Sequence, residues 1–306
     1  MARRHWTLLV AAMIALGGCA GQGGGAEVGG SGGDADGAGL ARMRQQAHDA
    51  LDRYTAAVKA AGGTSFVPVG PRTGQIGDWE ADQGDNKAAL VAGQVVAATA
   101  WPTPSPTTGR VVWASGSAQE FPLLSPGQAI AAMVVEGQRS GCGGCAPLQV
   151  TDAKLTTGSI DTTRGAAVVP VWEFTLRGSA VRITRVAVDP AVTVTVAPPS
   201  WDPNHSPAGL RIESATTSAG SSELIAHFTG NGGPASQPCG ADYTTEAIES
   251  ETAVVVIVVT HLHSGDDMCN AMGYLRQAPV RLSRPLGERA VLEVVEGQPV
   301  PLTITP

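Results

Sequence analysis

The residues of this chain best suited to chemistry are its five cysteines. Two of them, Cys142 and Cys145, are separated by two glycines, which is the spacing of thiol–disulfide exchange sites. In such sites the N-terminus of a helix lowers the pKa of the first thiol. Here Ala146 and Pro147 lead into a segment with a strand pattern instead. The motif therefore favours a structural clasp, with a redox pair as the alternative.

Another cysteine, Cys19, stands at the end of a pattern typical of an export signal. Arg3 and Arg4 precede an apolar segment, residues 6–16, and two glycines separate that segment from Cys19. Residues 16–19, Leu-Gly-Gly-Cys, resemble the lipobox of bacterial lipoproteins. This resemblance implies that residues 1–18 are removed as a signal peptide and that the Cys19 thiol carries a diacylglycerol.

The length of the apolar segments decides between a lipid anchor and a membrane-spanning helix. A transmembrane helix needs about 20 apolar residues, whereas residues 6–16 and the later run 254–259 are much shorter. Several acyl chains hold a protein firmly on a membrane. We therefore expect a protein anchored by its N-terminal lipid to the extracytoplasmic face of the cell membrane. An ordinary cleaved signal, or a spanning anchor, is the alternative.

The charge balance limits the classes of partner. The chain has 20 basic and 27 acidic residues, and loss of Arg3 and Arg4 leaves 18 against 27, a net charge of −9. Binding to nucleic acid or to an anionic membrane surface depends on clustered basic residues. The acidic balance therefore argues against both as partners.

The segment after Cys19 changes character at Leu40. Residues 19–39 are mostly glycine, cannot bury a core and are expected to form a flexible tether spanning about 25 Å. From Leu40 to Ala61 apolar residues recur every three or four positions, which predicts an amphipathic helix that ends at Gly62.

Residues 40–197 have the pattern of an α+β domain, with two helices on an antiparallel sheet. Ser125, Pro126 and Gln128 form a capping box that predicts the start of the second helix. Strand patterns follow at 148–156, 166–176 and 180–188, and a short turn predicts a hairpin between the last two.

Residues 198–207 are rich in proline and other turn formers and are expected to be a linker. Seven short strand patterns follow without a helical one, so residues 208–306 are expected to form a β-sandwich-like domain. The run 254–259 is continuously apolar, which predicts a central strand covered on both faces. The seven patterns are 210–215, 223–228, 243–249, 253–259, 280–282, 290–295 and 300–304.

The four cysteines beyond Cys19 are an even number, which in an exported chain usually means two disulfides. Three pairings are possible, and position favours Cys142 with Cys145 and Cys239 with Cys269. Zinc bound by all four is less favoured, because only one pair has ligand spacing.

Other candidate residues carry weaker signals. Trp201 and His205 lie in the predicted linker, where a ligand cleft between domains could form. His261 and His263 lie two apart on a strand and share a face, but they lack a clear third metal ligand. No catalytic motif and no cofactor motif stands out.

Two stretches resemble exported actinobacterial lipoproteins of unknown function. The resemblance supports the favoured disulfide pairing and the extracytoplasmic location, and it implies no activity. The first stretch contains Cys145-Ala146-Pro147-Leu148, Val169-Pro170-Val171-Trp172-Glu173-Phe174 and Arg185-Val186-Ala187-Val188; the second contains Cys239-Gly240-Ala241-Asp242-Tyr243, Cys269 and Pro285-Leu286-Gly287-Glu288-Arg289.

These observations together predict a non-enzymatic protein of the cell envelope. We expect it to bind a protein or another envelope ligand, without a cofactor or a metal. The alternative is a thiol–disulfide oxidoreductase that uses Cys142 and Cys145.

Overall fold

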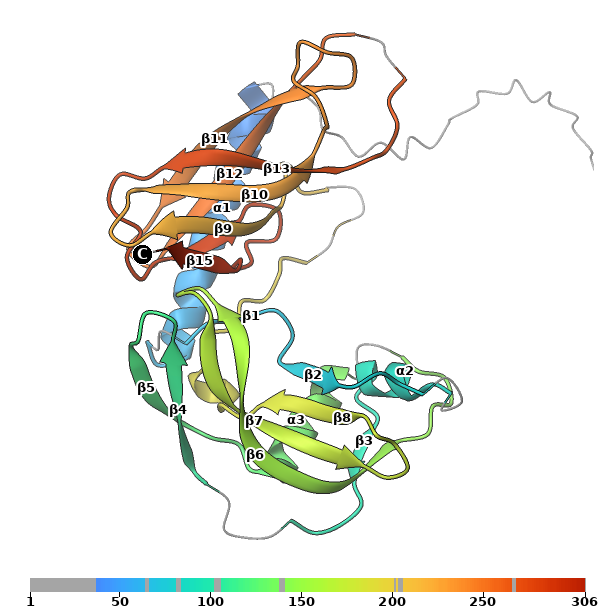
Figure 1. The fold of residues 1–306 in the computed structure, drawn as a ribbon. Helices are drawn as coiled ribbons and strands as arrows, with labels where there is room; N and C mark the ends of the chain where they lie inside the picture. The colour runs from blue at the N-terminus through green and yellow to red at the C-terminus, as the bar shows by residue number, and fades with distance from the viewer. Residues whose placement is uncertain are drawn as a thin grey trace, which may run out of the picture. The chain divides into compact units, whose positions relative to one another are not determined.

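The computed structural model describes residues 37–63, 66–80, 84–101, 106–137, 141–200, 202, 206–265 and 268–305 (Figure 1). The predicted signal peptide, Cys19 and nearly all of the predicted tether lie outside these residues. Within the described part of the chain, no helix has the length and apolar character needed to cross a membrane. Most of the regular structure in the described residues is β-sheet, with three α-helices.

Eight strands between residues 68 and 186 form one sheet. Its hydrogen-bonded path runs β1-β6-β7-β4-β5, while β8 pairs with β7 and β2, and β3 pairs with β6. All of these pairs are antiparallel except β3 with β6. The strands are β1 (Pro68–Val69), β2 (Thr73–Ile76), β3 (Val95–Ala97), β4 (Thr108–Trp113), β5 (Ala118–Pro122), β6 (Leu148–Thr162), β7 (Ala167–Leu176) and β8 (Arg182–Val186).

The longest pairing in this sheet joins β6 and β7, and its two flanking turns use glycine. Gly165, at φ +88°, lies in the turn between β6 and β7, and Gly178, at φ +72°, lies in the turn between β7 and β8. Glycine tolerates positive φ because it has no Cβ. The predicted hairpin of β7 and β8 is therefore confirmed.

Helix α3 (Pro126–Gly137) covers one face of this sheet. It begins as the capping box predicts: Gln128 N donates to Ser125 Oγ, and Ser125 N donates to Gln128 Oε1 at 2.9 Å. Ile130 and Met133 are buried in the core of the sheet. The shorter helix α2 (Asn86–Val91) was not expected from the sequence.

The strands after residue 208 form two facing sheets, as the predicted β-sandwich requires. A four-stranded sheet has the order β13-β10-β9-β15, and a three-stranded sheet has the order β11-β12-β14. A shared apolar core contains side chains from both sheets, among them Phe228 and Val256. The strands are β9 (Ile212–Ser218), β10 (Glu223–Gly230), β11 (Ala241–Glu249), β12 (Ala253–Leu262), β13 (Tyr274–Arg281), β14 (Ala290–Glu293) and β15 (Leu302–Thr305).

Strand β12 is central and is covered on both faces, which confirms the prediction from its continuously apolar run. Successive side chains of a strand point to opposite faces. Val254 and Val256 accordingly join the core of the sandwich, whereas Val255 and Ile257 join a second apolar cluster on the outer face. An apolar run without alternation is what a strand buried on both faces needs.

The second cluster is completed by helix α1 (Gly37–Ala60), which packs on β12 (Figure 1). Met43, Leu51 and Tyr54 are buried there. The expected helix is thus confirmed, but its expected place beside α3 on the first sheet is wrong. The helix covers the outer face of β12 because that face is the apolar surface matching its buried stripe. The first sheet is accordingly covered by α2 and α3, and the sandwich is not purely β.

Candidate functional site

Both favoured disulfides are present. Cys142 is bonded to Cys145, with a Cα–Cα distance of 5.7 Å, and Cys239 is bonded to Cys269, with a Cα–Cα distance of 5.5 Å. The pairing expected from position is therefore confirmed. The two bridges lie in different surroundings, which decides what each of them can do.

The Cys142–Cys145 bridge closes a tight turn between α3 and β6. Gly144, at φ +94°, occupies that turn, and the chain then enters β6 at Leu148. No helix begins within residues 141–148, so no helix dipole is available there to stabilise a thiolate. Cys145 packs against the core of the first sheet. This geometry suits a clasp that holds the approach to β6.

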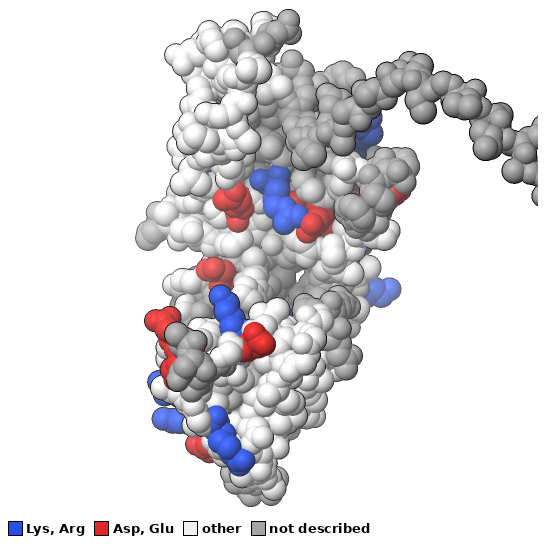
Figure 2. Space-filling view, turned by 90° about the vertical axis from the view of Figure 1, so that its right-hand side faces the viewer, with Lys and Arg blue, Asp and Glu red and all other residues white. Residues whose placement is uncertain are grey.

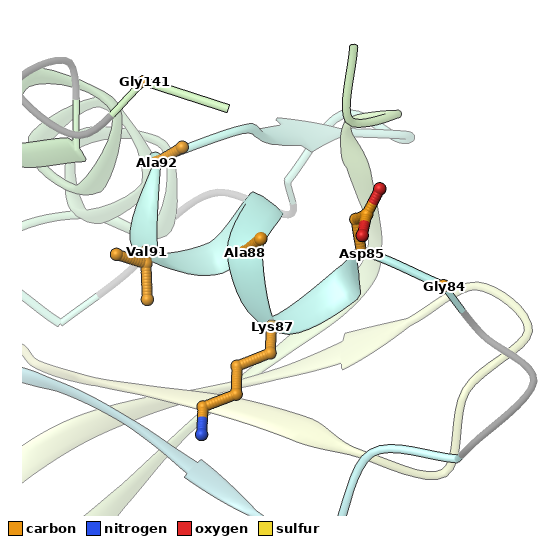
Figure 3. Close-up of a pocket in the computed structure, with 7 residues that line it drawn as sticks. All are labelled: Gly84, Asp85, Lys87, Ala88, Val91, Ala92 and Gly141. Atoms are coloured by element: carbon orange, nitrogen blue, oxygen red, sulfur yellow. The ribbon is translucent and has the colours of Figure 1, made fainter. Parts of the chain in front are cut away.

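A surface depression lies beside this clasp, between α2 and Gly141 (Figure 3). Its only charged lining residues are Asp85 and Lys87. Figure 3 shows their side chains pointing in different directions from α2 rather than toward one another. A ligand site normally has a few convergent polar groups. The depression therefore lacks the arrangement of a specific ligand or catalytic site.

The buried charges of the first sheet are used within the fold. Arg185 is 1% exposed, and its two terminal nitrogens donate to the two carboxylate oxygens of Glu136 at 2.5 and 2.6 Å. Thr73 Oγ1 accepts a further bond from Arg185 at 2.9 Å. The hydrogen bond from Arg185 holds the pKa of Glu136 below its ordinary value, against the opposing effect of burial. This group joins α3 to β8 and β2.

The buried charges of the sandwich are used in the same way. Arg289 donates to Glu249 Oε2 at 2.6 Å and to the carbonyl oxygens of residues 284, 285 and 286. Glu293, 2% exposed, accepts backbone N–H bonds from Val295, Glu296 and Gln298. These carboxylates hold loops in place, and each has its acceptor oxygens occupied by the protein itself.

The two candidate histidines are engaged separately. His261 Nε2 lies 2.8 Å from Thr244 Oγ1, and His263 Nδ1 lies 2.7 Å from the carbonyl oxygen of Ala235. A search of the described residues finds no group of three His, Cys, Asp or Glu side chains that could hold a metal ion. The predicted cleft residues Trp201 and His205, and the lipidation candidate Cys19, lie outside the described residues.

The most distinctive surface of the described chain is at the end of the sandwich that carries the Cys239–Cys269 bridge. Four large apolar side chains are exposed there: Met268 at 100%, Leu275 at 87%, Met272 at 59% and Tyr274 at 44%. We call this set the apolar cluster. The four lie within eight consecutive residues, although Tyr274 and Leu275 are neighbours on β13 and point to opposite faces of that strand. Exposed apolar side chains concentrated in one short segment mark a contact site more often than scattered ones do. The cluster is the candidate functional site.

The loop facing the apolar cluster is held by several contacts besides the disulfide. Tyr243 packs edge-on against Phe228, with ring centroids 4.9 Å apart, and its hydroxyl accepts from the backbone N–H of Asn231 at 2.6 Å. Asn231 Nδ2 donates to the carbonyl oxygen of Cys239 at 3.1 Å. Cys239 itself has φ +62°, a left-handed conformation that is uncommon for residues other than glycine. The neighbourhood of the cluster is therefore preorganised.

Sequence reasoning missed the apolar cluster. Met268, Met272 and Leu275 lie at positions i, i+4 and i+7, and Tyr274 directly precedes Leu275. The signal available in the sequence was therefore a short run of large apolar residues at helical spacing, in a segment that forms no helix. That signal does not distinguish exposed from buried side chains, so the sequence alone could not identify the site.

Comparison of the chain with models of known protein families, with curated proteins and with solved structures finds no match.

Proposed function

We propose that this chain is a lipid-anchored extracytoplasmic protein that binds a component of the cell envelope through its surface and does not act as an enzyme. The observation that carries the binding role is the apolar cluster beside the Cys239–Cys269 bridge. Large apolar side chains that are exposed within one short segment of a surface are more often covered by a contact than scattered ones are.

The two disulfides support the extracytoplasmic part of the proposal. Disulfides form and persist in oxidising compartments and are rare in the cytosol. Both bridges of this chain lie in loops rather than in regular structure, at Cys142–Cys145 and at Cys239–Cys269. An exported chain with the lipobox-like residues 16–19 fits that setting.

The arrangement of charged groups supports binding over catalysis. A catalytic acid or base needs a lone pair or proton that faces a substrate. Glu136, Glu249 and Glu293 instead direct their carboxylates at an arginine or at backbone N–H groups. For the alternative oxidoreductase role, the turn of residues 141–148 offers no helix N-terminus to activate a thiol.

The anchor is tested with Cys19→Ala in cells supplied with an alkyne-tagged fatty acid. The wild-type chain is expected to incorporate the tag and to sediment with membranes. The variant is expected to lose the tag and to appear in the medium with both disulfides formed, because the lipid is the only proposed anchor. A variant that stays in the membrane as firmly as wild type would show that another segment holds the protein.

A further inference from the structure

Helix α1 enters the sandwich from the end that carries the apolar cluster. Arg44, near the start of the helix, forms an ion pair with Glu246 of β11 at 2.7 Å. Thr55, near its end, lies 3.3 Å from the hydroxyl of Thr252, in the turn after β11. The helix therefore runs alongside β11 in the same direction as that strand.

The strand registers show which end of the sandwich β11 starts from. Ala241, its first residue, pairs with Leu262, the last residue of β12. In the facing sheet, Tyr274 of the apolar cluster pairs with Gly230. The Tyr243 ring lies next to Gly230 and 5.4 Å from the Arg276 guanidinium, so the start of β11 and the start of β13 lie at the same end.

It follows that the N-terminus of α1 points toward the end of the sandwich that holds the apolar cluster. Figure 1 shows the deepest blue part of α1 on the side of the loops at that end. The chain before Gly37 therefore joins the sandwich on the side of the cluster. Only 17 residues, 20–36, separate Gly37 from Cys19. A glycine-rich chain of this length spans about 25 Å, less than the length of most domains.

We propose that the apolar cluster inserts into the surface of the lipid bilayer that holds the anchor, so that the sandwich stands end-on at the membrane. This inference rests on the proposed lipidation of Cys19. The lipid brings the start of α1 to within a short tether of the bilayer, and the exposed side chains of the cluster lie at the same end of the sandwich as that start. The side chains of Met268 and Leu275 then move from water into the bilayer, at the boundary between the headgroups and the acyl chains.

The contact is apolar rather than electrostatic. Arg276, the basic residue next to the cluster, donates to the carbonyl oxygen of Gly232 at 3.2 Å and lies over the Tyr243 ring. Asp242 accepts from the backbone N–H of Ala235 at 3.3 Å. On the face drawn in Figure 2, the upper left of the molecule is white, and a blue side chain shows at the upper right beside residues drawn in grey. Insertion is therefore expected to be independent of headgroup charge.

The test uses the lipidated full-length chain in phosphatidylcholine vesicles, with a benzophenone amino acid at a single position. Leu275→p-benzoylphenylalanine places the photoreactive group in the apolar cluster. Val135→p-benzoylphenylalanine is the matched control, because Val135 is also an exposed apolar residue, at 66%, but lies on α3. Mass spectrometry after irradiation counts the covalent adducts to lipid.

Position 275 is expected to give at least about ten times more lipid adduct than position 135, which is the partition expected from burying one large apolar side chain. Adding Met268→Ser and Met272→Ser is expected to lower the adduct yield at position 275 several-fold. Replacing a third of the lipid by phosphatidylglycerol is expected to leave that yield unchanged.

The outcomes separate the two proposals. A chain whose mass lacks the acyl groups overturns the proposed anchor and this inference together. An acylated chain with equal lipid adducts at both positions overturns the inference alone. So does an acylated chain in which position 275 joins a second copy of the chain, because the cluster would then be covered by protein.

Discussion

The two halves of the described chain are built from similar parts, but their disulfides stabilise different features. Each has strands that pair mainly antiparallel, a helix that covers one sheet face and a disulfide in a loop. In the first sheet the bridge closes a ring of sequence separation 3 between α3 and β6. In the sandwich the bridge spans 30 residues and joins the loops beside exposed apolar side chains. The first bridge secures a turn, whereas the second braces a surface.

The largest effect is expected from removal of the longer bridge. The double variant Cys239→Ser/Cys269→Ser should lose about 3.5 kcal/mol of unfolding free energy, because a disulfide that closes a longer loop restricts the unfolded chain more. Urea unfolding followed by a probe in the sandwich measures this loss. Trp113 and Trp172 report the first sheet, and their transition should stay where it is in wild type.

The same unfolding experiment also tests whether the two halves are stabilised separately. If the tryptophan transition of the first sheet shifts as far as that of the sandwich, the two halves unfold as one unit and the bridges cannot be assigned to separate halves.

A smaller effect is expected from removal of the short clasp. The double variant Cys142→Ser/Cys145→Ser should lose about 2 kcal/mol or less, because the ring that it opens is very small. The reduction potential of the pair sharpens the comparison further. A structural clasp should resist reduction by glutathione. A strongly oxidising potential, with a thiolate that titrates below neutral pH, would favour the oxidoreductase alternative instead.

A smaller effect than that of either disulfide is expected at Glu136, which is held by an ion pair with Arg185. Glu136→Gln should cost about 1 kcal/mol at neutral pH, since the Glu136 side chain is 45% exposed and its charge is partly screened. The contribution of the carboxylate has a definite pH window. Its pKa is lower in the folded state than in the unfolded state. Its contribution is therefore complete above the unfolded pKa of about 4.3 and is lost as pH falls through the folded pKa.

Unfolding midpoints of wild type and Glu136→Gln measured from pH 7 to pH 3 check this window. The difference between the two proteins should shrink below about pH 4. A difference that stays constant down to pH 3 would mean that the carboxylate charge does not contribute. The surface pair Arg284–Glu251, in which Glu251 is 92% exposed, is the matched control. Glu251→Gln should leave the free energy of unfolding almost unchanged at every pH in this range.

Much of the local structure could be predicted because local physics governs it. The capping box at Ser125 and Gln128 satisfies the first N–H groups of α3 wherever that helix packs. The apolar run of β12 demands cover on both faces in any fold. The favoured disulfide pairing rested on position along the chain: Cys142 and Cys145 share one loop, and Cys239 and Cys269 lie in the loops before β11 and after β12.

The placement of α1 could not be predicted in the same way. Its buried stripe of Met43, Leu51 and Tyr54 shows that a sheet covers it but does not show which sheet. The partner, the outer face of β12, lies about 200 residues later in the sequence, as the ion pair of Arg44 with Glu246 illustrates, with a separation of 202. A hydrophobic stripe is not specific to one apolar surface, so shape and chain connectivity made the choice.

By itself, the sequence determined helices α1 and α3, the continuously apolar strand β12 and the favoured disulfide pairs, because each depends on neighbours in the chain or on spacing. Only the tertiary structure decided that α1 belongs to the sandwich, that Glu136 and Glu249 are held by arginines, and that Met268 and Leu275 are exposed at the end of the sandwich where α1 starts. These properties depend on which distant segments pack together. Whether a side chain is buried is set by those tertiary contacts and not by the residue type alone.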